Sequence, residues 1–383
     1  PATSRIPRKT SNGSFRKAVE ARIIPICEKL RRCMPGAVRF ARPLTGLCLG
    51  VLALTACAGV DQQPGQETVV MGAPLADTGL GNYLAARVAR LDLALALDSK
   101  DVERAMKRGR IASLLGMEGG HSIGSSLAVL RQTYELGARY MTLTHSRNTP
   151  WADSATDTPE HGGLTDFGKD VVREMNRIGM LVDLSHVSAE AMHDALDVAK
   201  APVIFSHSSA RAINGHARNV PDDILKRLPG NGGIIMVTFV PGFLSEPARQ
   251  WNANRAAEEA RLKALWQGQP AAVEAGMKEW DEANPLPKAG IALTADHIDH
   301  VRDIAGVESI GIGGDYDGIP FAPDGLEDVS TYPALFTELA RRGYTKTQLE
   351  QIAFGNMMRV MKKAEAYRDS VKEMPPIESP VPD

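Results

Sequence analysis

Six short apolar runs recur along the chain after residue 110, and most of them end in a polar or ionisable residue. They are rich in Leu or β-branched residues, apolar on both faces, and followed by segments with helical periodicity. Buried parallel strands that are joined by crossover helices have this pattern. We therefore expect strands at about 111–117, 140–145, 180–185, 202–206, 233–239 and 309–314.

The same pattern predicts two helices before the first of these strands, at 80–97 and 100–109. Further helices are expected near 124–137, 166–178, 188–199, 222–228, 253–281, 294–305, 332–342 and 346–367. Such alternation predicts an α/β fold, a TIM-type (β/α)8 barrel of the metal-dependent hydrolase kind. This barrel needs eight strands, and the residues before 111 look like a tether and helices. We therefore expect the barrel to be incomplete at its first two strands.

The beginning of the chain has a different character. Residues 1–57 contain a basic upstream segment and then an apolar stretch of the length of a signal sequence. Its end, Leu54-Thr55-Ala56-Cys57, resembles a bacterial lipobox, which predicts a lipid anchor on Cys57; the alternative is an ordinary cleaved signal peptide with an incidental cysteine. We then expect a flexible tether over 58–77, the barrel over 78–370 and a Pro-rich tail over 371–383.

Composition narrows the possible chemistry. Hydrophobic residues make up 43% of the chain and charged residues 23%, as in ordinary soluble globular proteins. The formal net charge of −2, without a basic cluster in the second half, gives no support for a nucleic-acid partner. All four cysteines lie within the first 57 residues. Any metal in the barrel must therefore be held by histidines and carboxylates.

Ionisable residues follow the predicted strands, and active sites of β/α barrels lie where strands end. Glu118 stands between glycines after the first strand and could bridge two cations, or be a solvated turn carboxylate. His186 and His207 end two successive strands, and neutral imidazole is the commonest zinc ligand. A hydrogen-bonded structural role is the alternative for each. Asp183, on the same strand as His186 and separated from it by Leu184 and Ser185, is a candidate acceptor for a histidine N–H.

Further polar residues complete this candidate site. His145 is either a third ligand or a donor to a reacting carbonyl, and a polar loop suited to recognition follows it at 146–154. Arg218 could bind a carboxylate through two parallel hydrogen bonds, or form an ion pair with Asp222 or Asp223 at the surface. Asp315 and Asp317 follow the last strand, where a carboxylate can accept a proton from activated water. Asp315, nearer the strand, is the preferred base.

His297 and His300 have the spacing of barrel metal ligands, but they fall within a predicted helix. We interpret them as residues of the helix surface.

Several long stretches occur in the order typical of one known family. They are GMEGGHSIG, LGARYMTLTHSRNTPWADSA, HGGLTDFGKDVVREMNRIGMLVDLSHVS, APVIFSHSSARA, RNVPDD, HIDHV, GIGGDYDGIP and FGNMMRVM. From about residue 80 to 367 the chain resembles the membrane (renal) dipeptidases, zinc peptidases of the amidohydrolase barrel type. The resemblance implies two Zn2+ ions, with Glu118 bridging them and His186 and His207 on one of them.

The same resemblance implies roles for the remaining residues. His145 would lie near the scissile carbonyl, Arg218 would bind the terminal carboxylate of the peptide, and Asp315 would transfer the proton. With Asp317 nearby, these residues form the expected substrate site. The implied activity is the hydrolysis of dipeptides, including some with a C-terminal D-residue. The lipobox-like sequence, rather than this resemblance, predicts a location at the bacterial cell envelope, facing the periplasm or exterior, with the membrane reached through Cys57. A homodimer is a further possibility.

One part of the family pattern is missing. The family begins with a strand that carries His-x-Asp, which supplies ligands for the other zinc, but residues 1–110 contain no histidine. An internal deletion would leave an impaired or inactive dipeptidase-like lipoprotein. A variant with one metal would use Glu118, His186 and His207 and keep an open position, which suffices for a catalytic zinc. We favour deletion, because an open barrel exposes sheet edges. A weaker alternative is a related barrel hydrolase that acts on a lactone or another amide.

Overall fold

The structure of the protein is a computed structural model that describes residues 52–55 and 93–380. The predicted tether at 58–77, Cys57 and the upstream segment, apart from Leu52–Thr55, lie outside the described residues. Among the helices that the structure describes, none is long and apolar enough to cross a membrane.

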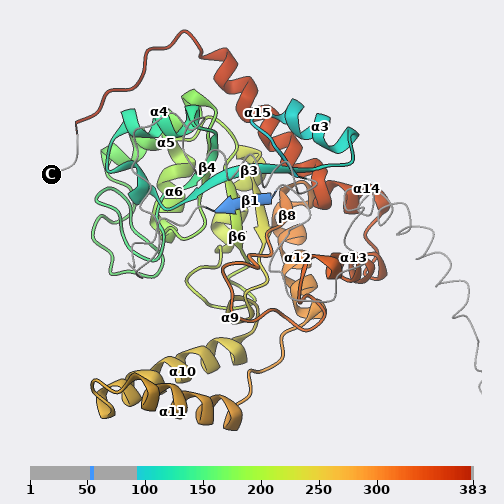
Figure 1. Ribbon diagram of the computed structural model, residues 1–383. Coiled ribbons are helices and arrows are strands. Elements are labelled where there is room, and N and C mark those ends of the chain that lie inside the picture. Colours follow the sequence, from blue (N-terminus) through green and yellow to red (C-terminus); the bar gives the residue numbers. More distant parts are fainter. Residues whose placement is uncertain (1–51, 56–92, 381–383) are drawn as a thin grey trace, which may run out of the picture.

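One parallel sheet forms the centre of the fold (Figure 1). Its order, β1-β3-β4-β5-β6-β7-β8, follows the chain, and β2 also pairs with β3. The strands are β1 Leu52–Thr55, β2 Leu93–Leu95, β3 Ile111–Glu118, β4 Ala138–Thr142, β5 Leu181–Asp183, β6 Ile204–Ser208, β7 Ile234–Val237 and β8 Ile310–Ile312. The six strands predicted from the apolar runs are confirmed, with ends shifted by at most three residues.

The sheet is a curled half-barrel that is incomplete at its beginning, as expected. β1 and β2 do not fill two successive positions but share one edge of β3. β2 aligns with Ile111–Ser113, and β1 aligns with Ser113–Gly116. Seven positions therefore lie across the sheet, and among the described residues no ladder joins β8 to β1.

The helix predicted at 80–97 is wrong at its end, because Leu93–Leu95 is strand β2. The earlier part of this prediction, residues 80–92, lies outside the described residues. Leucine recurs at every second residue from Leu91 to Leu97. This period of two suits an extended segment, and pairing with the open edge of β3 outweighs the helical propensity of Leu and Ala.

The helices largely follow the predicted pattern. Helix α5 has the predicted bounds, whereas the predicted helix at 253–281 is a pair, α10 and α11, separated by a turn. The helices are α3 Ser99–Lys107, α4 Leu127–Glu135, α5 Asp166–Ile178, α6 Ala189–Val198, α7 Asp222–Leu225, α8 Leu228–Asn231, α9 Pro241–Leu244, α10 Glu246–Leu265, α11 Pro270–Ala283, α12 Ile291–Ala305, α13 Tyr332–Arg341, α14 Lys346–Glu350 and α15 Asn356–Ser370; short 3-10 helices lie at Gly120–Ile123, Val307–Ser309 and Val329–Thr331, and a π-helix at Gln351–Gly355.

Helix α5 shows how local signals set these elements. The Thr165 side chain accepts a hydrogen bond from Gly168 N at 3.3 Å and caps the first turn. Val171 and Met175, four residues apart, are fully buried against the sheet side of the core. Gly179, with φ of 82°, ends the helix in the left-handed region that favours glycine. Each fully buried apolar side chain stabilises the fold by about 1.5–3 kcal/mol.

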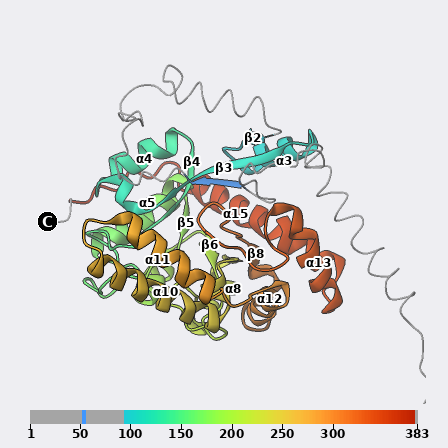
Figure 2. The ribbon, with the colours of Figure 1, turned by 60° about the horizontal axis from the view of Figure 1, so that its bottom comes forward.

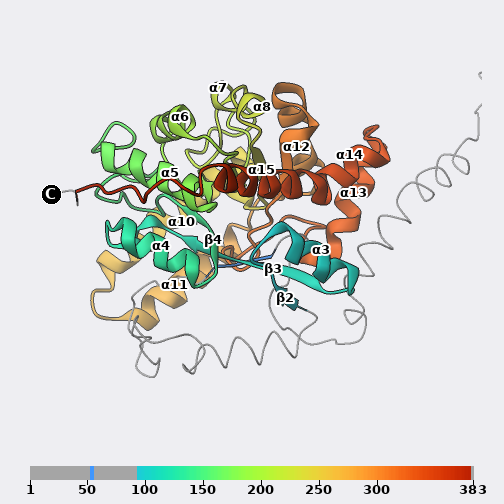
Figure 3. The same ribbon diagram turned by 90° about the horizontal axis from the view of Figure 1, so that it is seen from above.

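Two helical features lie on different sides of the sheet. Helices α10 and α11 form a hairpin that lies apart from the sheet in Figure 1, and Figure 2 shows the two helices side by side. The hairpin follows β7 through α9, so it begins on the side where the strands end. Helix α15 contacts α3, α5, β7 and β8 and runs across the molecule in Figure 3.

Candidate active site

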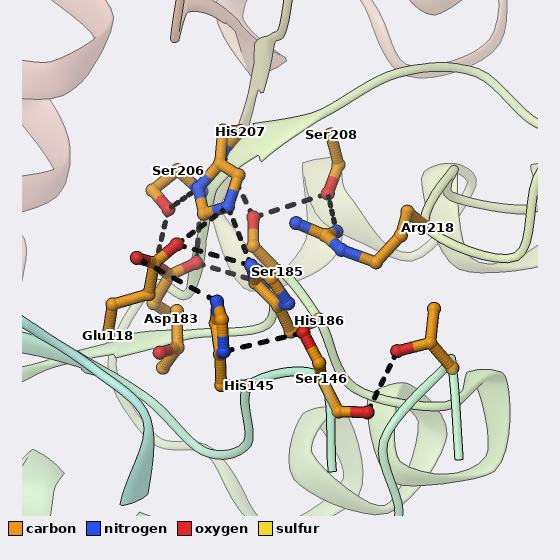
Figure 4. Close-up of polar contacts among 12 residues, drawn as sticks. Glu118, His145, Ser146, Asp183, Ser185, His186, Ser206, His207, Ser208 and Arg218 are labelled. Atoms are coloured by element: carbon orange, nitrogen blue, oxygen red, sulfur yellow. Dashed lines mark hydrogen bonds and ion pairs between the residues drawn. The ribbon is translucent and has the colours of Figure 1, made fainter. Parts of the chain in front are cut away.

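Three potential ligand atoms converge where the strands end (Figure 4). Glu118 is the last residue of β3, His186 follows β5 by three residues, and His207 lies within β6. His186 Nε2 is 2.9 Å from His207 Nε2, and both nitrogens are 3.2 Å from Glu118 Oε1. The side chains are only 10–13% exposed. The parallel strands thus bring together the three residues predicted as metal ligands.

The spacing of these atoms fits a metal ion. Ligands bound to a tetrahedral zinc ion at about 2.0–2.2 Å lie roughly 3.3–3.5 Å from one another. The observed separations of 2.9 and 3.2 Å are close to that range. Within residues 52–55 and 93–380 this is the one group of three His, Cys, Asp or Glu residues whose ligand atoms all lie within 4.8 Å. The described residues therefore provide donors for one ion.

The charge states of the group suit metal binding. Burial lowers the pKa of His186 to about 2, with the charges of Arg218 and His207 acting in the same direction and Glu118 opposing them. Burial acts to raise the pKa of Glu118, but its hydrogen bonds to His186 and His207 outweigh burial and hold this pKa well below its usual range. At neutral pH the site therefore contains a carboxylate and a neutral His186 imidazole, the forms that bind metals.

Two site residues, each located shortly after the end of a strand, have a positive backbone φ angle. His186 has φ of 74° and Asp315 has φ of 59°, the left-handed region that non-glycine residues seldom adopt. Such a conformation costs on the order of 1–3 kcal/mol and persists where the surrounding structure enforces it. Gly120 is required for a different reason, since a Cβ there would lie 2.5 Å from Leu143 O and from the Trp151 ring.

A hydrogen-bond chain orients His207 (Figure 4). Ser206 Oγ donates to Asp183 Oδ2 and lies 2.7 Å from His207 Nδ1. With its proton directed to Asp183, the Ser206 hydroxyl can only accept from His207 Nδ1–H. His207 Nε2 is then left with its lone pair facing the metal site. The expected contact of Asp183 with a histidine thus runs through Ser206, which sequence reasoning missed; a hydroxyl residue directly before a predicted ligand was its signal.

Asp183, the buried end of this series of hydrogen bonds, is itself fully buried. Its Oδ1 accepts hydrogen bonds from Ser185 N at 3.0 Å and Ser206 N at 2.9 Å. Burial raises the pKa of Asp183, although the charge of His207 and these hydrogen bonds oppose the increase.

His145 lies beside the ligand group rather than within it. Its ring centroid is 4.4 Å from that of His186, and its Nε2 is 4.0 Å from Glu118 Oε2. The side chain is 46% exposed, unlike the three ligands. Of its two predicted roles, this position suits a donor to a bound molecule better than a third histidine ligand.

Arg218 is a buried cation with few partners. It is 3% exposed, and its guanidinium lies 3.5 Å from Ser208 Oγ and 5.3 Å from the centre of the Phe243 ring. Among the described residues no carboxylate forms an ion pair with it. Burial lowers the pKa of Arg218 to about 10, opposed by Asp315, Asp183 and Glu118, so it stays charged at neutral pH.

The alternative of a surface ion pair for Arg218 is wrong. Asp222 instead accepts from His300 Nε2 at 2.7 Å, and Asp223 contacts His193 Nε2 at 2.9 Å. A buried, unpaired guanidinium is costly unless an anion binds to it. The arrangement therefore fits recognition of an anionic group.

The two aspartates after β8 differ in environment. Burial raises the pKa of Asp315, and His207 and Arg218 partly offset this effect. Asp315 thus lies within electrostatic reach of the site, whereas Asp317 is exposed. A carboxyl group with a raised pKa is a better proton acceptor, which suits the role expected for Asp315.

Two sequence interpretations need correction. His297 lies on α12 as predicted, but it is fully buried rather than on the helix surface, because Ala210 N donates to its Nδ1 and its Nε2 donates to Leu244 O. The polar loop at 146–154 is also not simply a recognition surface. Trp151, Asp153 and Ser154 are at most 2% exposed and hold the loop in place.

Comparison with known proteins gives a consistent result. The family described as "Membrane dipeptidase (Peptidase family M19)" matches residues 75–375. Dipeptidase 3 of Macaca fascicularis is 44% identical over 278 residues, which is 71% of this chain and 49% of that protein. The chain therefore spans about half the length of this relative.

Solved structures agree with the family match. The probable dipeptidase PvdM from Pseudomonas aeruginosa is 26% identical, with a TM-score of 0.64 over 75% of this chain and 78% of that one. A metallo peptidase from Rhodobacter sphaeroides, solved with a phosphinate mimic of the dipeptide L-Ala-D-Ala, is 24% identical, with a TM-score of 0.59 over 74% of this chain and 73% of that one. The second likeness shows the fold alone. From the extent of the family match, together with these relatives, it follows that the chain belongs to the membrane dipeptidase family, peptidase family M19.

Proposed function

We propose that this protein is a zinc-dependent dipeptidase that hydrolyses the peptide bond of dipeptides, including some with a C-terminal D-residue. The observation that carries the proposal is the convergence of Glu118, His186 and His207 within 2.9–3.2 Å, beside the unpaired Arg218. Zinc held by these residues would supply a Lewis acid and lower the pKa of water to about 7. The choice of substrates that include a D-residue follows from membership of the membrane dipeptidase family.

Other side chains of the site would bind the substrate, stabilise the developing charge and transfer the proton. Arg218 would bind the terminal carboxylate of the dipeptide, where its planar group can form two parallel hydrogen bonds. His145 would donate a hydrogen bond to the scissile carbonyl oxygen and stabilise the negative charge that develops there. Asp315 would accept the proton from the attacking water and return it to the leaving amine. Asp317, exposed near Asp315, would contact the amino end of the substrate.

A second candidate is a dipeptidase-like protein that binds peptide or metal but is catalytically impaired. It is favoured by the absence of histidine before His121 and by the single ligand group among the described residues. Both candidates bind zinc, so turnover has to separate them.

The location and assembly of the protein are further proposals. We propose that Cys57 carries a lipid anchor that holds the protein at the bacterial cell envelope, facing the periplasm or exterior, and that a homodimer can form. Cleavage before Cys57 would remove Leu52–Thr55, which the structure places against β3. The mass of the purified mature protein decides whether this strand is retained.

The central experiment measures hydrolysis of a panel of L,L- and L,D-dipeptides by the full chain. For a working dipeptidase, turnover disappears on chelation and returns with added zinc. Glu118→Gln, which keeps the shape of the side chain and removes its charge, should reduce zinc binding and turnover together. A folded protein that binds zinc but shows no turnover with any dipeptide would favour the impaired candidate.

A further inference from the structure

Residues Asp153 to Ala155 connect the two histidines that follow β4 and β5. Ser154 Oγ donates to His145 O at 2.7 Å and lies 3.4 Å from His186 O. The next residue, Ala155, donates its N–H to His186 O at 2.7 Å. One short segment therefore contacts the backbones of both His145 and His186, although these residues follow different strands.

Hydrogen bonds to Asp153 and Ser154 fix the position of the segment 153–155 itself. The Asp153 carboxylate accepts hydrogen bonds at 3.0 Å from the backbone N–H groups of Glu160, His161 and Gly163. Ser154 N donates to Asn148 Oδ1 at 2.8 Å. Asp153 and Ser154 are 1% and 2% exposed, so water does not compete for these bonds. The Ser154 hydroxyl is therefore a fixed donor.

The His145 ring depends on this backbone bond more than the His186 ring does. Its polar neighbours are distant, with Ser146 Oγ at 3.4 Å and Glu118 Oε2 at 4.0 Å, and nearly half of the side chain is exposed. Weak contacts do not fix the direction of a ring, so its Cα position and backbone direction must do so. His186, by contrast, is also held by Ala155 N and by its contacts with Glu118 and His207.

We propose that Ser154 is a positioning residue whose hydroxyl fixes His145 relative to the metal ligands. The inference rests on the proposed function, because His145 is given its role in turnover there. It assigns the buried serine to transition-state geometry rather than to metal binding. A displacement of about 1 Å can reduce a rate by up to a hundredfold.

The first test is Ser154→Ala, which removes the donor to His145 O and the acceptor of the Thr156 N–H but leaves the Ala155 N–H in place. The value of kcat should decrease by about tenfold or more, while KM and zinc affinity change by less than about twofold. Ser309→Ala is the matched control. Its hydroxyl is equally buried and donates to Ala305 O at 3.1 Å, but it lies before β8, at the opposite end of the strands from the site.

A double-mutant cycle separates positioning from general structural damage. In a His145→Ala background, Ser154→Ala should cause no further loss of kcat, because the residue that it positions is already absent. A tenfold loss in both backgrounds would overturn the proposal, as would a wild-type kcat in the single variant.

Amide hydrogen exchange tests the same contact without substrate. Ser154→Ala should speed exchange at residues 143–148 and leave exchange at 204–208 in β6 unchanged. If the wild-type protein hydrolyses no dipeptide, the proposed function fails, and the exchange result alone decides whether Ser154 holds His145. Unchanged exchange at 143–148 would refute this role of Ser154.

Discussion

Arg218 shows how a single residue can indicate a ligand. The residue is 3% exposed, yet no carboxylate among the described residues pairs with its guanidinium. Most buried charges are paired, because removing an unpaired charge from water costs several kcal/mol. The free terminal carboxylate of a peptide would provide the missing partner.

Replacing Arg218 with Met should therefore raise KM for free dipeptides by roughly a hundredfold, which corresponds to the loss of a charge-assisted interaction of about 3 kcal/mol. Steady-state kinetics provide the measurement. Dipeptide amides, which lack the carboxylate, are the control and should be hydrolysed by both proteins at similar efficiency. An unchanged KM for free dipeptides would instead support the lactone or amide hydrolase alternative.

Ser206 links a buried carboxylate to a predicted metal ligand. Ser206→Ala should weaken zinc binding by about 10- to 100-fold, because His207 loses the acceptor that directs its Nε2 lone pair to the metal. Competition with a chromophoric chelator measures this change. Ser209→Ala is the control, since the buried Ser209 hydroxyl has no hydrogen-bond partner among the described residues. Equal zinc affinities for the two variants would contradict the orienting role of Ser206.

At the scale of elements, α12 is anchored to the β6 side of the barrel by a buried histidine. His297 accepts from Ala210 N at 3.1 Å, and its Nε2 donates to Leu244 O. Burial lowers the pKa of His297 to about 4. The neutral ring therefore belongs to the folded state, and protonation opposes folding.

This anchor predicts a loss of stability in mild acid. Between pH 6.5 and 4 the unfolded chain binds a proton at His297 that the folded protein does not, so the free energy of unfolding falls as pH decreases. The total loss is about 3 kcal/mol and is complete below pH 4. Urea unfolding of wild type and His297→Gln across this range measures it, and the variant should show the shallower pH dependence. His121→Gln, at an exposed position, should retain the wild-type dependence; identical slopes for all three proteins would be inconsistent with this anchor.

At the scale of the whole molecule, the half-barrel limits the metal site. Strands β3, β5 and β6 contribute Glu118, His186 and His207, whereas the edge beyond β3 carries the short segments β1 and β2. Neither Leu52–Thr55 nor Leu93–Leu95 contains a metal-binding side chain. The described residues therefore offer ligands for one ion.

We therefore expect the full chain to bind about one zinc ion per molecule. Elemental analysis after dialysis against zinc measures the stoichiometry, and His186→Ala should reduce it to near zero. Two ions per wild-type molecule would mean that residues outside 52–55 and 93–380, or a second chain, contribute further ligands.

Most of the helices and strands could be predicted from the amino-acid sequence. Short apolar runs with β-branched residues, separated by helical segments, favour buried strands. The six strands after residue 110 and the bounds of α5 followed from this pattern. The identity of the candidate ligands also followed, because ionisable residues at the ends of parallel strands must meet at one edge of the sheet. The helical prediction was wrong at Leu93–Leu95, where pairing with the free edge of β3 makes the segment a strand.

The contacts between these residues, by contrast, depend on how distant segments pack in the folded protein. Sequence spacing cannot reveal that Ser206 lies between Asp183 and His207, that Ser154 Oγ donates to His145 O, or that Arg218 is buried with no carboxylate partner among the described residues. Each fact depends on segments brought together by packing. The burial of His297 is of the same kind, because a helical residue is placed inside or outside by the loops that cover it. Periodicity reports which face of an element is apolar; burial and hydrogen-bond partners depend on what packs against that face.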